Sequence, residues 1–145
     1  MKRLWGGLTG LVLIASLSPV MADEVGAECP SGENWLECRA AAGDKLAIYR
    51  LGRTAYDEAR ETGDFSEPLR MGRQLAYEED RNGKRLLKMV HLQLSWGNHN
   101  DYVQAYDWMV EDQDKGFDYL EPLIGNLAEK MTPEQLAQAR SLAAE

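Results

Sequence analysis

The residues with the most specific chemistry are two histidines, His91 and His99. They stand eight positions apart across a glycine break, which is not a recognised metal-binding spacing, and a zinc site would need further ligands. We therefore expect both imidazoles to lie at the surface or at the edge of the core. The chain has no H-E-x-x-H, G-x-S-x-G or phosphate-loop pattern. The sequence accordingly predicts no metal, no other cofactor and no catalytic residue.

Two acidic runs could bind a cation. They are residues 78–80, with sequence EED, and residues 111–114, with sequence EDQD. An EF-hand loop alternates its ligands and ends in a bidentate glutamate. Neither run has that order, so solvated helix ends are the better interpretation. A carboxylate pair for glycoside hydrolysis would meet only in the fold, and an enzyme of the cell envelope, such as a cell-wall hydrolase, remains an alternative.

The chain has two cysteines, Cys29 and Cys38. Without a nearby histidine or a third cysteine they cannot complete a tetrahedral zinc site, and their spacing is not C-x-x-C. In an oxidising compartment such an isolated pair favours a disulfide. Its short loop limits the stabilisation to about 2.5–3 kcal/mol.

The N-terminus has the pattern of a secretory signal peptide. Lys2 and Arg3 precede a mostly apolar run over residues 4–17, and residues 20–22, with sequence VMA, fit a signal-peptidase site. The run is too short to span a bilayer comfortably. We expect cleavage near Ala22 and a periplasmic or secreted bacterial protein with no stable membrane insertion.

Cleavage would leave 123 residues (145 minus 22), enough for one domain with a modest core. It would also leave 14 basic residues (16 minus 2) against 24 acidic ones, a net charge of −10. Such a chain repels nucleic acid and anionic lipid. We therefore expect a partner that is another protein or peptide, with basic or mixed charge favoured.

A helical pattern follows, and no stretch shows sustained strand alternation. We expect residues 1–22 to be the signal peptide, residues 23–43 a flexible leader with the disulfide, and residues 44–145 a helical repeat domain. The predicted helices are residues 44–63, 66–83, 84–96, 101–116, 119–130 and 133 to the C-terminus. The predicted N-caps are Asp44, Ser66, either Asn100 or Asp101, and Thr132, the last within a capping box.

Two segments of the chain resemble each other. Residues 50–56, with sequence RLGRTAY, match residues 70–77, with sequence RMGRQLAY, given one insertion. Such self-similarity is a reason to suspect a solenoid. Gly52 and Gly72 lie on apolar faces, which predicts close helix–helix approach. The arginines beside them form either a ligand patch or partners for the chain's own carboxylates. They are Arg50, Arg53, Arg70 and Arg73.

Residues 101–108, with sequence DYVQAYDW, and Gly116 resemble the second half of a Sel-one-like repeat, an α/α relative of the tetratricopeptide repeat. Residues 47–52, with sequence AIYRLG, resemble the start of such a repeat, and residues 131–139 resemble a terminal capping helix. The resemblance implies an all-α fold, a short α/α solenoid of about two helix pairs plus a C-terminal cap. It departs from the family pattern at Ala55, where a tyrosine is usual, and the second repeat has no clean L-G.

The family resemblance also suggests a function. Members of this family are mostly adaptors that bind proteins or peptides on a concave surface, and some resemble immunity proteins that neutralise toxic effectors. A cysteine-rich branch linked to β-lactam binding has a cysteine pattern that this chain lacks. We expect a non-enzymatic protein–protein interaction module, with immunity as the narrower alternative. The first helix of each pair would line the groove, and the candidate partner-binding residues are Tyr49, Arg53, Tyr56 and His91.

Overall fold

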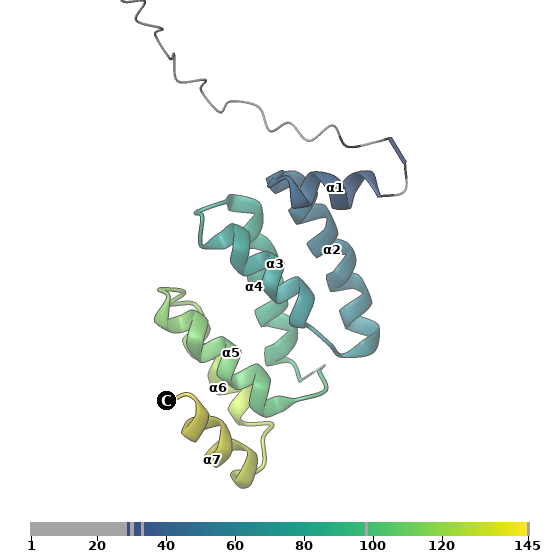
Figure 1. The fold of residues 1–145 in the computed structure, drawn as a ribbon. Helices are drawn as coiled ribbons and strands as arrows, with labels where there is room; N and C mark the ends of the chain where they lie inside the picture. Colours follow the sequence, from purple (N-terminus) through teal and green to yellow (C-terminus); the bar gives the residue numbers. More distant parts are fainter. Residues whose placement is uncertain (1–28, 30, 33, 98, 145) are drawn as a thin grey trace, which may run out of the picture.

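The computed structural model describes residues 29, 31–32, 34–97 and 99–144, and these residues form seven helices and no strand (Figure 1). The helices are α1 (Trp35–Ala41), α2 (Lys45–Thr62), α3 (Ser66–Ala76), α4 (Arg81–Ser95), α5 (Tyr102–Asp114), α6 (Leu120–Ala128) and α7 (Pro133–Leu142). The predicted all-α class is confirmed. The expected signal peptide, residues 1–22, lies outside the described residues.

The helices follow one another through space in chain order, from α1 at one end to α7 at the other (Figure 1). Helix α4 packs against α2, α3 and α6, while α5 packs against α6 and α7. Helices α2, α4 and α6 therefore form one row of neighbours, and α3 packs against both α2 and α4. The core is built from aliphatic and aromatic side chains of these helices. Its largest fully buried members include Phe65, Leu75, Leu86, Leu87, Leu94, Met109, Leu120 and Leu127.

Several helix ends lie where the sequence predicts them. The carboxylates of Asp44 and Asp101 accept hydrogen bonds from backbone N–H groups at the starts of α2 and α5. Thr132 and Gln135 form the predicted capping box of α7. Gly63 ends α2 with φ +79°, a left-handed conformation that suits glycine.

The boundary between α3 and α4 differs from the prediction. Helix α3 ends at Ala76, and Asn82 and Gly83 lie in the first turn of α4 instead of closing α3. The cause is Asp80, whose carboxylate accepts hydrogen bonds from the N–H groups of Asn82 and Gly83 and so begins a new helix. The longer α4 now includes Arg81.

The start of α3 also differs from the prediction. Ser66 is the first residue of the helix and not its N-cap, which is Phe65. The Asp64 carboxylate accepts hydrogen bonds from both the N–H and the hydroxyl of Ser66, at 3.0 and 2.6 Å. An aspartate two residues earlier therefore organises this end of the helix.

Gly52 and Gly72 permit close helix packing, as the sequence predicts. A Cβ atom on Gly52 would lie 2.4 Å from a Leu86 methyl carbon, and one on Gly72 would lie 3.2 Å from the Leu87 backbone. The two glycines belong to α2 and α3, which are consecutive, packed helices. Their matching segments therefore mark one helix pair and do not mark equivalent positions in successive pairs.

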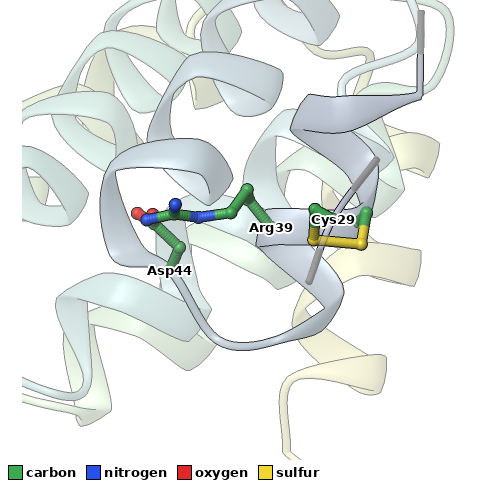
Figure 2. The surroundings of a disulfide bond; sticks show 4 residues. Cys29, Arg39 and Asp44 are labelled. Atoms are coloured by element: carbon green, nitrogen blue, oxygen red, sulfur yellow. A yellow bond between two sulfur atoms is a disulfide. The ribbon is translucent and has the colours of Figure 1, made fainter. Parts of the chain in front are cut away.

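Cys29 and Cys38 lie at disulfide distance, with their sulfur atoms 2.11 Å apart, as the sequence predicts. Figure 2 shows this bond beside Arg39, whose side chain reaches the Asp44 carboxylate at the start of α2. Helix α1 occupies residues 35–41, within the segment expected to be a flexible leader, and the prediction missed it. This helix has no buried residue; the disulfide ties it to the preceding residue 29, and the Arg39–Asp44 ion pair links it to the start of α2.

Candidate functional site

The described residues contain a buried polar cluster centred on Asp112, which is fully buried. One oxygen of this carboxylate accepts hydrogen bonds from Arg73 Nε at 2.8 Å and from the Tyr77 hydroxyl. The other oxygen lies 2.8 Å from His91 Nε2, and His91 Nδ1 lies 3.0 Å from the Tyr119 hydroxyl. We call these five residues the Asp112 cluster.

The Asp112 cluster ties four parts of the fold together. Arg73 lies in α3 and Tyr77 caps its end, His91 lies in α4, Asp112 lies in α5, and Tyr119 precedes α6. Arg73 also donates a hydrogen bond to a backbone carbonyl of α5 at 3.0 Å. Partners so far apart in the chain meet only through packing, so local spacing in the sequence does not reveal them.

Burial and hydrogen bonding fix the charges of the cluster. Burial opposes ionisation of Asp112, but hydrogen bonds from His91 and Tyr77 and the charge of Arg73 hold its pKa below the ordinary value of 3.8. Burial lowers the pKa of His91 below 6.5, against the attraction of Asp112. Near neutral pH the cluster therefore holds a neutral imidazole, which donates through Nε2 to an ionised carboxylate and accepts at Nδ1 from Tyr119.

The Asp112 cluster is suited to bracing the fold. Both ring nitrogens of His91 are engaged, and the side chains of His91 and Asp112 have no exposed surface. The imidazole therefore has no nitrogen left to exchange a proton with a substrate. In the described part of the chain, no three or more His, Cys, Asp or Glu side chains gather as a metal site would require.

His99 lies in the connection between α4 and α5, at a core edge as expected. Its ring packs edge-on against Tyr102, with ring centres 4.6 Å apart. Neighbouring Asn100 donates a hydrogen bond to the Thr62 carbonyl at 2.9 Å and so joins this connection to the end of α2. These contacts give the connection a structural role.

The four predicted partner-binding residues are placed differently from one another. Tyr49 and Arg53 are partly buried on α2, where Arg53 Nη1 lies 3.6 Å from the Met89 sulfur atom. Tyr56 is only 8% exposed, and its hydroxyl donates to the Gln93 side chain of α4. His91 is fully buried in the Asp112 cluster. Burial removes Tyr56 and His91 from any partner-binding surface of this fold, while Tyr49 and Arg53 stay at the α2–α4 boundary.

An exposed stripe runs along α4 on the side opposite its buried residues. Its members recur every three or four positions, which places them on one face of a helix. They are Arg81, Arg85, Lys88, Leu92 and Trp96. We call them the α4 stripe. Trp96, at the C-terminal end of the helix, is 60% exposed, although most of the aromatic residues around it were expected in the core.

The cations of the α4 stripe form no ion pair with any carboxylate in the described ranges. The Lys88 ammonium instead lies 5.4 Å from the Tyr119 ring centre. On α2, the Arg53 guanidinium lies 5.9 Å from the Tyr56 ring centre and contacts Met89, the residue after Lys88. Arg53 therefore continues the basic surface from α4 onto α2.

The structure separates the two interpretations of the four arginines beside the glycines. Arg70 pairs with Glu67, and Arg73 pairs with Asp112 and Glu111. Arg50 and Arg53 are not in an ion pair with the described carboxylates. The α3 arginines thus serve the fold, and the α2 arginines remain available for a ligand.

The α4 stripe was not predicted from the sequence, because this helix was expected to begin at Lys84. With Arg81 assigned to the preceding helix, the spacing of the cations did not stand out. The available signal was the composition of residues 81–95, which contain four Lys and Arg residues and no Asp or Glu.

No protein-family model matches the chain, and no curated protein or solved structure is significantly similar to it. Within the described ranges, no helix combines the length and apolar character needed to cross a membrane. The functional interpretation therefore depends on the residues of the chain itself.

Proposed function

We propose that this chain is a protein-binding adaptor of the bacterial envelope, and that it engages its partner on the α4 stripe and the adjoining part of α2. The observation that carries the proposal is the stripe itself, a row along α4 and its C-cap in which exposed arginine, lysine and tryptophan side chains flank the half-buried Leu92. Tryptophan and arginine are the commonest energetic anchors of protein interfaces. An exposed Trp96 in line with unpaired cations is therefore the surface best suited to a protein partner.

The Sel-one-like resemblance supports the same proposal. Under it, α2–α3 and α4–α5 are the two helix pairs of a short solenoid, α7 is the terminal cap, and the first helices of the pairs, α2 and α4, line the binding side. The packing of α2 against α3 and α4 fits that arrangement, whereas α4 packs mainly against α3 and makes few contacts with α5. The Sel-one-like elements fall on α2 and α5, and the capping segment falls on α7.

The proposed compartment follows from the N-terminal pattern and the cysteine pair. A disulfide between Cys29 and Cys38 suits an oxidising compartment. Protein isolated from the periplasm should begin at Asp23 and contain no free thiol, as measured by intact mass with and without alkylation.

Affinity capture of the tagged protein from envelope extract, after mild cross-linking, tests the adaptor function. The wild type should capture a defined partner, and the double variant Arg85→Glu/Lys88→Glu should lose it. The control Lys115→Glu/Arg140→Glu changes the net charge equally at exposed positions in the α5–α6 connection and on α7 and should retain the partner. Capture of the same partner by the α4 variant would overturn the proposed surface. A toxic effector as the partner, with toxicity relieved by co-expression, would select the immunity role.

A further inference from the structure

We infer that the partner binds through an acidic, extended segment that lies along α4 and ends in an apolar side chain against Trp96. This inference rests on the proposed function and adds the chemistry of the partner. It also revises the expectation from net charge, which favoured a basic or mixed-charge partner. The local charge of the binding surface, and not the sum over the chain, decides which segment can dock.

Charge is segregated between neighbouring helices. Helix α4 carries four basic residues and no acidic one, in a chain with 16 basic and 24 acidic residues. Helix α5, the next helix in the chain, shows the reverse, with three acidic residues besides the buried Asp112 and no basic one. A surface that served solubility alone would intersperse the two signs.

Two of the four cations of α4 lie at the end of the helix where a positive charge stabilises it least. Arg81 and Lys84 occupy the first turn, beside the partial positive charge of the helix N-terminus, and no acidic residue shares that turn. Lys84 is paired with Glu79, but Arg81 has no ion pair among the described residues. Helix stability does not account for Arg81, whereas an anionic ligand would.

Arg53, beside the stripe, and Lys88, within it, are held in place without an ion pair to the described carboxylates. The Arg53 stem lies against Met89 and the Tyr56 ring, and Lys88 lies over the Tyr119 ring. Such contacts reduce the conformational freedom that a side chain loses on binding. They leave the positive charge open to a carboxylate from another molecule.

The spacing of the stripe fits an extended peptide. Arg81 and Arg85 are separated by about 6 Å along the helix axis, at about 1.5 Å per residue. Alternate side chains of an extended chain are about 6.7 Å apart on one face. Acidic residues at alternate positions can therefore face successive cations, with an apolar residue following toward Leu92 and Trp96.

A peptide fits this surface better than an anionic membrane does. The stripe is one helix wide, and the chain as a whole carries a net charge of −8. A flat anionic membrane would approach more of this acidic chain than the stripe alone and be repelled. An extended segment can follow the stripe alone.

Fluorescence anisotropy with the mature protein tests the inference. The probe is a labelled peptide of alternating Glu and Ser ending in Leu, and a Gln-for-Glu peptide is the control. We expect binding to the Glu peptide only, weakened by raising salt from about 0.05 M to about 0.5 M. Arg85→Glu/Lys88→Glu should weaken it about tenfold or more. The neutral variant Arg85→Gln/Lys88→Gln should also weaken it, and Lys115→Glu/Arg140→Glu should not.

Three outcomes would overturn the inference. They are equal binding of both peptides, unchanged binding by the α4 variants, and stripe-dependent binding of phosphatidylglycerol vesicles without binding of the peptide. Circular dichroism of each variant confirms that the fold is intact. If the peptide fails while partner capture still depends on the stripe, the adaptor proposal stands and only the acidic chemistry is lost. Peptide binding without any captured partner would contradict the adaptor role and leave the acidic preference standing.

Discussion

Asp112 carries its charge with no exposed surface, and it depends on Arg73, Tyr77 and His91 for compensation. We expect Asp112→Asn to lower the free energy of unfolding by about 3–5 kcal/mol, because it removes one partner of a buried ionic cluster. Tyr77→Phe should cost about 1.5 kcal/mol, at the low end for a hydrogen bond to a charge, since Tyr77 is 44% exposed.

Urea unfolding measures both effects. Tyr106→Phe is the matched control, because Tyr106 is partly buried and its hydroxyl makes no hydrogen bond to the described residues. Equal stability of the Tyr77 and Tyr106 variants would contradict a bracing role for the cluster.

His91 should make stability depend on pH. Burial lowers its pKa in the folded protein below the unfolded value of 6.5, so the unfolded chain binds the proton first as the pH falls. The contribution of neutral His91 to the free energy of unfolding is fully present above pH 6.5 and is lost as the pH falls through the pKa of His91 in the folded protein. The loss is at most about 1.4 kcal/mol per pH unit for one proton.

Urea midpoints measured at about pH 7.5 and about pH 5.5 test this dependence. The wild type should lose more stability between these pH values than His91→Gln does. Burial also lowers the pKa of His99, so some dependence should persist in the variant. Identical losses in the two proteins would exclude His91 as a source.

The sequence did not predict the Asp112 cluster. His91 was assigned to a binding surface, and Asp112 to a solvated acidic run. Their contact joins positions 21 apart on two different helices and forms only in the folded domain. The excess of cations in α4 was visible in the sequence, but one misplaced helix boundary concealed its alignment.

At the scale of the helix, Arg81 should reduce the stability of α4. Arg81→Glu replaces an unfavourable charge in the first turn with a favourable one, which should add about 0.3–1 kcal/mol. The melting temperature should rise by about 1–4 °C, while affinity for the acidic peptide falls. Arg140→Glu makes the same charge change in the last turn of α7, where a basic residue is favourable, and should lower stability. Shifts of the same sign in both variants would contradict this account.

Helix α1 should depend on the disulfide. It has seven residues, none of them buried, and so short a helix is not stable alone in water. Reduction of Cys29–Cys38 should speed amide hydrogen exchange across residues 35–41 and leave the core residues of α4 protected. Exchange that increases equally in α1 and α4 would show that the bond stabilises the whole domain.

The prediction of elements succeeded where local chemistry decides the structure. Asp44, Gly63 and Thr132 specify helix ends through their own backbone contacts, and the sequence predicts all three. It failed at α1, which has no apolar stripe buried against the core. It also failed at the α3–α4 boundary, where Gly83 was expected to end a helix but the N-cap Asp80 begins one. Glycine close to a stronger N-cap does not end a helix.

At the scale of the whole molecule, the two sides of α4 have different roles, one in stabilising the fold and the other in the proposed binding of a partner. The Asp112 cluster, on the buried side of α4, joins α3, α5 and the residue before α6 to that helix. The α4 stripe, on the opposite side of the same helix, remains open. Because the Asp112 cluster restrains α4, the helix should lose little conformational entropy when a partner binds.

Site-specific photo-cross-linking in the envelope tests the central claim most directly. A photoreactive residue replaces Lys88 on the stripe in one strain and Arg140 on α7 in another, both at exposed positions. We predict one defined cross-linked protein from position 88, lost when Arg81 and Arg85 are changed to Glu, and none from position 140. The same product from both positions, or a product from position 140 alone, would contradict the assignment of the α4 stripe as the partner-binding surface.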